Sequence, residues 1–451
     1  MLITSHNFLE HGSKKPLTPD GYNLKEIVIT NHSGVSKEIR NIVVKFSITE
    51  SLYSNTLVAK FSVVDSANFF EEFPITGQET IEIKLERKSN FIPNPKNEDL
   101  ILKFFVTEYP LYGRSGQHTQ VYSFSAISPH AFASSFRKIS RAYAERSDSE
   151  IKKIIVNDLN VPEEKFKLTG EPSSISKGLI NIQSPLKAAE WFRAKTFDKD
   201  FAPFFLFQTM LGNIQLSSFT SLVQQKAYGK PYIHTTGFSQ NAQTIEDYDE
   251  RATRIIETAS DLKLGKIFQG SAGAFASNNN YLDYTSKTYT KYNYQYSKDL
   301  LTKNNSLEKK TVLSKSFKTG SEEIDTLANA HCEYTSINSG AYEGTTNYNA
   351  LRKQTKGITT AYTELLETKA HEVVLCGDMF LNAGRVIELK FQRTMDPQLM
   401  KDILDKNPRD IWDQHISGRY LITSAIHNFE GGKYYTNVKV KRDSFSIDID
   451  K

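Results

Sequence analysis

The chain has 451 residues, of which 39% are hydrophobic, and a formal net charge of +4 from 56 basic and 52 acidic side chains. It is about three times as long as the commonest domain, so two to four domains with substantial cores are expected. This composition excludes a single small module and wholesale disorder. It also argues against a dedicated nucleic-acid binder, which would carry a basic excess.

The sequence has no pattern typical of a membrane span, an export signal or a disulfide framework. No apolar run approaches the roughly 18 residues that a membrane span requires. Residues 1–6 lack the basic and apolar regions that open a signal peptide. Cys332 and Cys376 are too few for a disulfide framework or for a zinc site of their own. We therefore expect reduced thiols in a protein made in a cytoplasm.

Residues 1–127 show the two-residue alternation of β-strands. Ile81, Ile83 and Leu85 alternate with charged residues. Similar runs occur at 42–49, 57–64, 100–107 and 120–127. Because turns and no helical pattern separate these runs, we predict an antiparallel barrel or sandwich. Apolar residues on the outward strand faces, together with an aromatic content of 12%, favour self-association.

Residues 128–200 are predicted to be mainly helical. An amphipathic stripe over 132–143 predicts a first helix, and Ser-Asp-Ser-Glu at 147–150 fits a capping box for a second. Pro162 ends this second helix, and the Ser184-Pro185 pair opens a third with proline at the tolerated first position.

The middle of the chain is less regular. Residues 201–245 begin with two short strands, 204–207 and 213–217, around a turn at Leu211-Gly212. Over residues 246–345 the patterns predict a helix from Tyr248 to near Gly265, a loop at 270–280, an extended strand pair through the tyrosine-rich segment 281–296, and a helix from Ser321.

Residues 346–451 return to strands after a helical pattern at 351–366. The strand patterns lie at 373–375, 387–391, 420–426 and 434–441, the last two around a tight turn at Gly431-Gly432. A polar insertion at 396–413 interrupts them. The sequence thus predicts an α+β fold, mainly β, in which two β modules flank a helical and irregular part.

The sequence contains no clear catalytic, cofactor or metal motif. It lacks the His-Glu-x-x-His pair of zincins and the Gly-x-Ser-x-Gly elbow of serine hydrolases. Residues 270–274 lack the Gly-Lys-Ser/Thr ending of a phosphate loop, and the adjacent acidic pairs give no evidence for a glycosidase. His331-Cys332 could share a metal with Cys376, but a helix-packed histidine beside an inert buried cysteine is the simpler interpretation. We predict no catalytic, cofactor-binding or metal-binding residue.

Three groups of residues stay open to a binding role. The tyrosines of 281–296 either stack on bases or sugars or pack one aromatic face on the core or another chain, and we favour packing. The basic residues Arg137, Lys138 and Arg141 form either a phosphate patch or a solvated face, and we favour solvation. On the C-terminal hairpin, the cations that either line a channel or face water are Lys433, Lys439, Lys441 and Arg442.

Three stretches together carry a resemblance to a known family. They are 47–54 with the strands at 57–65 and 77–83, then 184–191 with the hairpin at 203–219, and finally 375–389 with 418–427. In this order they resemble the baseplate hub proteins of contractile-tailed (T-even-like) bacteriophages, to which the spike-base proteins of type VI secretion and the phage late-control D proteins are related. The insertion at 396–413 and the region 270–296 depart from the family pattern, and no fused lysozyme-like section is apparent.

The resemblance implies a structural protein and no enzyme. Residues 1–127 and 346–451 would be two tail-tube-like antiparallel β-barrels. Between them would lie a helical α+β insertion at 128–200, strands at 201–245 that complete the first barrel or the insertion, and a helical and extended region at 246–345. A homotrimer of such chains would form a pseudo-sixfold ring between the hexameric tail tube and the trimeric central spike.

The resemblance also implies further partners and a location. Other baseplate (wedge) proteins would bind the hub, while DNA and the tape-measure protein would pass through its lumen without specific binding, which fits the near-neutral charge. The protein would belong to the virion, at the baseplate of a contractile tail, after assembly in the host cytoplasm, and would need no cofactor. The alternative function is a tail-associated glycan-binding or cell-wall-degrading protein.

Overall fold

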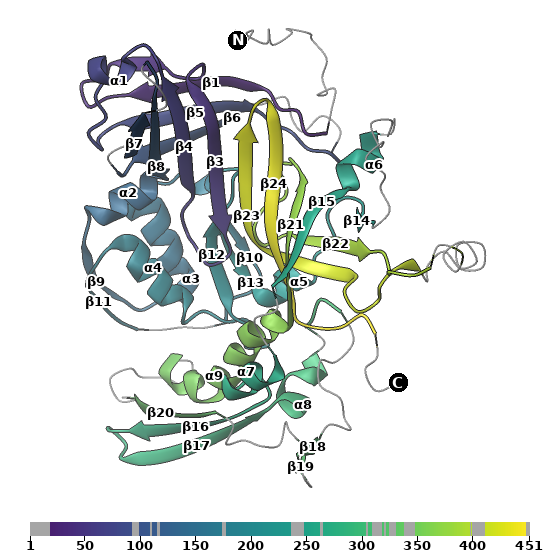
Figure 1. The fold of residues 1–451 in the computed structure, drawn as a ribbon. Coiled ribbons are helices and arrows are strands. Elements are labelled where there is room, and N and C mark those ends of the chain that lie inside the picture. The colour runs from purple at the N-terminus through teal and green to yellow at the C-terminus, as the bar shows by residue number, and fades with distance from the viewer. Residues whose placement is uncertain are drawn as a thin grey trace.

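The computed structural model describes residues 19–92, 99–108, 111–114, 118–173, 177–235, 248–261, 265–303, 305–308, 318–319, 322–323, 331–337, 348–396, 398 and 411–447. Figure 1 shows the N-terminal strands (purple) beside the C-terminal hairpin (yellow), with helices beneath them. Among the helices of these residues, none has the length and apolarity needed to cross a membrane.

The N-terminal residues supply one half of the main sheet. The bounds are β1 (Leu24–Thr30), β2 (Ser36–Glu38), β3 (Val43–Ser51), β4 (Val58–Asp65), α1 (Phe69–Glu72), β5 (Thr80–Glu86), β6 (Asp99–Val106), β7 (Leu111–Arg114) and β8 (Gln120–Ile127). Ile81, Ile83 and Leu85 are fully buried in one core cluster with Phe46 and Phe61. The strands predicted for residues 1–127 are therefore confirmed, with the predicted inward face.

The other half comes from the C-terminal residues and from two strands of the middle. The bounds are β14 (Tyr232–His234), β15 (Ile255–Asp261), β21 (Lys369–Cys376), β22 (Val386–Phe391), β23 (Gly418–Glu430) and β24 (Lys433–Arg442). β23 and β24 form the predicted hairpin, whose turn residues Gly431 and Gly432 have φ of 58° and 78°. Glycine adopts these angles without the strain that a Cβ would cause.

The two halves form one continuous sheet. β3 pairs antiparallel with β23, from Ser51 opposite Ser424 to Lys45 opposite Glu430. The strand order is β15-β21-β24-β23-β3-β4-β8-β6-β5-β1-β2, with β7, β14 and β22 attached outside this path. Closure of the N-terminal strands into a ring would need a partner for β3 among them, but β23 occupies that edge. The fold is mainly β, as predicted, and the described strands form an open sheet and no closed barrel.

A small α/β layer packs under the N-terminal half (Figure 1). Its elements are α2 (Pro129–Ser135), β9 (Ile139–Tyr143), α3 (Ser147–Lys153), a π-helical turn (Ile154–Asp158), a 3₁₀ turn (Glu163–Lys165), β10 (Phe166–Thr169), β11 (Gly178–Gln183), α4 (Pro185–Arg193), β12 (Phe204–Gln208), β13 (Ile214–Ser218) and α5 (Phe219–Val223). Ser184 is the N-cap of α4 and Pro185 its first residue, as predicted. The β12–β13 hairpin with Gly212 in its turn is also confirmed.

Two details of this layer differ from the prediction. The helix expected over 132–143 stops at Ser135, because the following residues pair with β11 as β9 and this tertiary pairing overrides the helical stripe. The capping box at 147–150 does not form. Arg146 is the N-cap of α3, and the Glu150 carboxylate instead lies near Lys153 and Arg141.

The middle residues form a second, smaller α/β layer (Figure 1, bottom). Its elements are α7 (Lys266–Ser271), β16 (Ala276–Asp283), β17 (Thr288–Gln295), α8 (Tyr296–Asp299), a 3₁₀ turn (Leu301–Lys303), β18 (Lys318–Thr319), β19 (Glu322–Glu323), β20 (Cys332–Ile337), α9 (Tyr348–Leu365) and a 3₁₀ turn (Leu366–Thr368). The short helix α6 (Tyr248–Thr253) lies apart from this layer, beside β21 of the main sheet (Figure 1). The predicted strand pair at 281–296 is confirmed as β16–β17, and the predicted helix at 351–366 as α9.

Three predictions for the middle were wrong. The helix from Tyr248 ends at Thr253, because 255–261 joins the sheet as β15 beside β21. The loop expected at 270–280 is the end of α7 and most of β16, whose asparagines pair in register with β17 and β20. Glu322 and Glu323 lie in a strand and not in a helix, and 324–330 lie outside the described residues, as does most of the 396–413 insertion.

The end of β24 is anchored by a buried carboxylate. Asp443 Oδ1 accepts hydrogen bonds from the Leu307 N–H (3.0 Å) and the Ser444 hydroxyl (2.7 Å). Burial raises the pKa of Asp443 to about 6. The folded protein therefore prefers this carboxyl in its neutral form.

This burial predicts a pH dependence that one substitution removes. Between pH 4 and 6 the folded state holds one more proton on Asp443 than the unfolded state, so the free energy of unfolding falls by about 3 kcal/mol as the pH rises. Urea unfolding of wild type and Asp443→Asn at pH 4, 5, 6 and 7 measures this difference. The comparison of wild type with Asp65→Asn should show the opposite sign. Backbone N–H groups outweigh the burial of Asp65 and lower its pKa, so the stability that Asp65 contributes rises with pH. Parallel curves for wild type and Asp443→Asn would contradict the prediction.

Candidate functional site

The residues considered for a metal site lie in different environments. Cys332 is exposed on β20, whereas Cys376 is buried on β21 and its thiol lies 3.4 Å from the Arg251 carbonyl. Burial raises the pKa of Cys376 to about 11, so the group is an inert thiol at neutral pH. His331 Nδ1 lies 3.1 Å from the Ser271 carbonyl and precedes a strand, not within a helix as expected. No cluster of three or more His, Cys, Asp or Glu that could hold a metal occurs in the described part of the chain.

The tyrosines of the segment 281–296 differ in exposure. Tyr281, Tyr294 and Tyr296 are buried, which confirms the packing interpretation for these three, whereas Tyr284 and Tyr289 are exposed.

The cations considered for a patch or a channel are largely engaged. Arg141 donates to both carboxylate oxygens of Asp158, at 2.9 and 2.7 Å. Lys441 pairs with Glu367, and Arg442 is fully buried and donates to the Ser417 and His415 carbonyls. The prediction that Arg442 lines a channel or faces water was therefore wrong. Its guanidinium is buried because it donates hydrogen bonds to backbone carbonyls of the segment just before β23.

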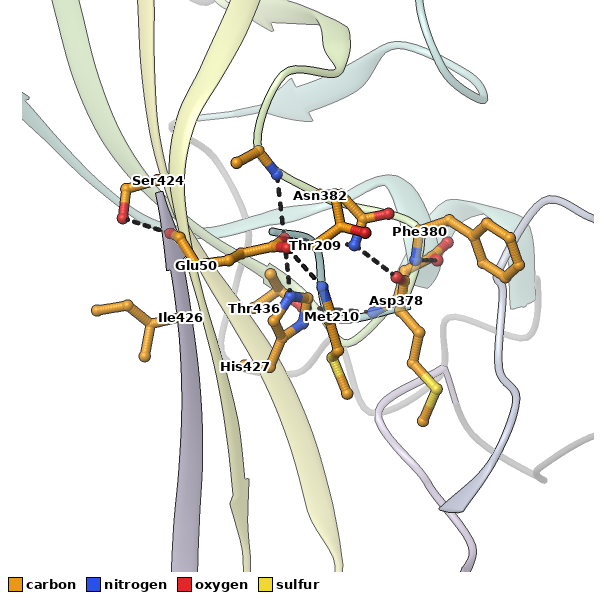
Figure 2. Close-up of polar contacts among 12 residues, drawn as sticks. Glu50, Thr209, Met210, Asp378, Phe380, Asn382, Ser424, Ile426, His427 and Thr436 are labelled. Carbon is orange, nitrogen blue, oxygen red and sulfur yellow. Dashed lines mark hydrogen bonds and ion pairs between the residues drawn. The ribbon is translucent and has the colours of Figure 1, made fainter. Parts of the chain in front are cut away.

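The most organised polar cluster lies where the two halves of the sheet meet. It comprises six buried residues from both halves, and we call it the buried junction: Glu50, Gly377, Asp378, Asn382, His427 and Tyr434. Figure 2 shows its carboxylates surrounded by donors from several segments.

Glu50 is a charged residue at an inward position of β3. Phe46 and Ile48 point into the core, and Glu50 continues their alternation with only 1% of its surface exposed. The Met210 N–H donates to its carboxylate at 2.7 Å and the Ala383 N–H at 3.0 Å (Figure 2). The first donor lies in the β12–β13 turn and the second in the β21–β22 loop. A buried carboxylate with this many donors links segments that are far apart in the sequence.

Two side chains complete the ring around Glu50. Asn382 Nδ2 donates to Glu50 Oε1 at 3.3 Å, and His427 Nε2 of β23 lies 3.3 Å from the same oxygen. The other ring nitrogen of His427, Nδ1, lies 2.7 Å from the Tyr434 hydroxyl. Burial raises the pKa of Tyr434 well above its usual value, so the hydroxyl stays neutral.

The position of Tyr434 also explains why residue 377 is a glycine. A Cβ on Gly377 would lie 2.1 Å from Tyr434 Cγ and 2.5 Å from its carbonyl oxygen, so no larger residue fits at this position. The Gly377 N–H donates to that same carbonyl at 2.8 Å. The tyrosine ring stacks on Phe429 with centroids 4.3 Å apart.

Asp378 makes a second set of links. Its carboxylate accepts from the Asn90 N–H (2.9 Å), the Phe380 N–H (2.8 Å) and the Tyr228 hydroxyl (2.8 Å). Burial raises the pKa of Asp378 despite these donors. Asn90 follows β5 and Tyr228 precedes β14, so Asp378 attaches both connecting segments to the β21–β22 loop.

The buried junction is built to hold and not to react. Glu50, His427 and Tyr434 are exposed by 1%, 0% and 0%, so no substrate reaches them without opening the sheet. The sequence places five of the six junction residues, all but Tyr434, within the stretches that resemble the hub family, and it predicted no role for any of the six. The signal it had was a carboxylate at the inward end of an apolar alternation, Phe46-x-Ile48-x-Glu50.

No family model and no curated protein sequence matches the chain. Solved structures do match. The 43 kDa tail protein of prophage MuSo2 from Shewanella oneidensis aligns at 12% identity over 94% of this chain and 100% of that chain, with a TM-score of 0.50. The tail protein from Neisseria meningitidis MC58 aligns at 10% identity over 94% and 98%, also with a TM-score of 0.50. The fold is that of these tail proteins.

A third structure, a component of the type VI secretion system of E. coli, has a TM-score of 0.39 at 11% identity, over 89% of this chain and 73% of that chain. The first two structures confirm, at the level of the fold, the resemblance to phage tail proteins that the sequence predicted.

Proposed function

We propose that the protein is the structural hub of a contractile phage tail baseplate, a homotrimer that joins the tail tube to the central spike without catalysis. The observation that carries this proposal is the buried junction, which fixes two β modules of a tail-protein fold in one continuous sheet. Three such chains present six β modules, which suits a threefold ring that contacts a sixfold tube.

The outer surface supports self-association. Phe105 of β6 stacks on Phe132 of α2 with centroids 4.4 Å apart, and Phe136 lies against Phe132 at 5.0 Å. Phe136 is 77% exposed, and Ile101 on the same outward face of β6 is 49% exposed. We call Phe105, Phe132 and Phe136 the aromatic strip. An exposed strip of this kind is typical of a subunit contact.

The remaining parts of the proposal follow the predicted resemblance. We propose that the chain divides into five parts, with boundaries at 127, 200, 245 and 345. We also propose that it binds wedge proteins, belongs to the virion after assembly in the host cytoplasm, and surrounds a lumen that passes DNA and the tape-measure protein.

Mass photometry tests the proposal. We expect particles of three times 51.2 kDa, and complexes when the tube and spike proteins of the same tail are added. Phe136→Asp should weaken trimer formation at least tenfold, because it places a charge in the aromatic strip. Leu179→Asp, at a 59% exposed position on β11, is the matched control and should leave the trimer intact. A chain that stays monomeric with and without tube and spike proteins would overturn the proposal.

A further inference from the structure

The three-stranded sheet β17–β16–β20 has two chemically different faces. Gly357 of α9 lies against Ser277 and Tyr294, so these residues mark the face that α9 covers. Lys356 of α9 also pairs with Glu333 of β20 on this side, at 3.3 Å. Because side chains alternate along a strand, the residues between them point to the opposite, outer face.

Strand register identifies the outer face. Asn278, Asn280 and Leu282 of β16 lie opposite Asn293, Lys291 and Tyr289 of β17, and opposite Cys332, Tyr334 and Ser336 of β20. The flanking side chains are exposed, with Tyr289 at 59% and Tyr334 at 75%. Two exposed aromatic rings therefore stand on either side of a central strand that carries amides.

The amides between these rings are buried and incompletely bonded. Asn280 is 2% exposed and accepts a hydrogen bond from the Tyr289 hydroxyl. Asn278 is 5% exposed, and among the residues that the structure describes its Oδ1 has no hydrogen-bond partner. A buried polar atom without a partner costs free energy, and Asn278 lies on this outer face, so a ligand that binds here would gain by supplying the missing partner.

We propose that this outer face binds an oligosaccharide. Flat apolar rings of Tyr289 and Tyr334 suit the C–H faces of sugar rings, and hydroxyl groups both donate and accept, so they satisfy Asn278 in either orientation of its amide. Among the described residues of this face the charged one is Lys291, which repels neither neutral nor acidic sugars. A protein partner would instead favour a broader apolar face.

The geometry also sets the ligand length. β17 and β20 lie on opposite sides of β16, and Tyr289 and Tyr334 are offset by two residues along it, so they are about 12 Å apart. One sugar ring does not span this separation. An oligosaccharide should bind, and the matching monosaccharides should not compete at equal concentration.

This inference goes beyond the proposed function and does not depend on it, because the site lies on one chain and needs no tube or spike. The test uses the full chain on a printed array of neutral and acidic bacterial oligosaccharides, with the Kd measured by concentration series. We expect Tyr334→Ala and Tyr289→Ala each to weaken binding about tenfold, whereas Tyr334→Phe keeps the ring and the affinity. Leu179→Ala, at an exposed position on β11, is the distant control.

Asn278→Ala separates binding from folding. It removes a buried atom that lacks a partner, so the melting temperature should stay equal or rise while oligosaccharide binding weakens about tenfold. A purely structural asparagine would show the reverse.

Two outcomes would overturn the inference. One is a wild-type chain that binds no oligosaccharide on the array, or binds one equally well after Tyr334→Ala. The other is a Tyr334→Ala variant that changes the particle mass in mass photometry and leaves sugar binding unchanged, since the face would then be a contact with a second copy of the chain. Neither result would change the expected complex with tube and spike proteins.

Discussion

Replacement of Glu50 by alanine is expected to destabilise the protein by about 3–5 kcal/mol, the usual cost of removing one partner from a buried charged network. The Met210 and Ala383 N–H groups lose their acceptor, and His427 loses the carboxylate at its Nε2. All three groups stay buried, so water does not replace the lost contacts. Because Glu50 joins β3 to the β12–β13 turn and the β21–β22 loop, the two halves of the sheet should also lose their fixed alignment.

Urea unfolding followed by circular dichroism measures this loss. Glu82→Ala is the matched control, since Glu82 lies on the outward face of β5 and pairs with Lys103 at 3.0 Å with both side chains largely exposed. Removal of such a surface pair should cost less than about 1 kcal/mol. A Glu50→Ala variant as stable as Glu82→Ala would show that the carboxylate does not hold the junction.

Replacement of Gly377 by alanine is the second change with a large expected effect, a loss of about 3 kcal/mol or more. The added Cβ would meet Tyr434 Cγ at 2.1 Å and the backbone oxygen of Tyr434 at 2.5 Å. Neither can move away, because the ring stacks on Phe429 and the oxygen belongs to the β24 backbone. The expected cost comes from steric overlap and not from backbone strain, because φ of Gly377 lies outside the left-handed region.

Thermal and urea unfolding test this second change against Gly113→Ala. A Cβ on Gly113 has no atom within 4 Å, so that control should change the stability by no more than about 0.5 kcal/mol. Combining Gly377→Ala with Tyr434→Ala should cost less than the sum of the single changes, because each removes the other's obstacle in part. Fully additive costs, or a harmless Gly377→Ala, would disprove the steric argument.

The local pattern of the sequence was sufficient for most strands and for several helices. Period-two alternation in Ile81, Ile83 and Leu85 reflects one buried face, which any sheet containing this strand must have. Ser184-Pro185 and Gly431-Gly432 act through their own backbone chemistry, so they mark a helix start and a turn wherever they stand. These signals depend on neighbouring residues only, and the strand, the helix start and the turn that they predict are confirmed.

Signals that depend on a distant partner were missed. Residues 139–143 and 255–261 carry helical patterns but form β9 and β15, because β11 and β21 offer strand edges to pair with. The asparagine-rich residues 276–280 looked like a loop but are central in a sheet between β17 and β20. Strand formation is decided by cross-strand contacts more than by intrinsic preference, so one sequence window does not contain the answer.

Local signals were enough to predict a mainly β chain with two β modules and a helical middle, because alternation, turns and caps depend on neighbouring residues. Five of the six residues of the buried junction, all but Tyr434, lie within the stretches that resemble phage baseplate hub proteins. The pairing of β3 with β23, and the contact of Glu50 with His427 and the loop at 377–383, became visible in the folded chain and not in any sequence window. The physical reason is that a buried carboxylate is tolerated only where donors converge, and these donors come from residues about 160 to 380 positions away in the chain.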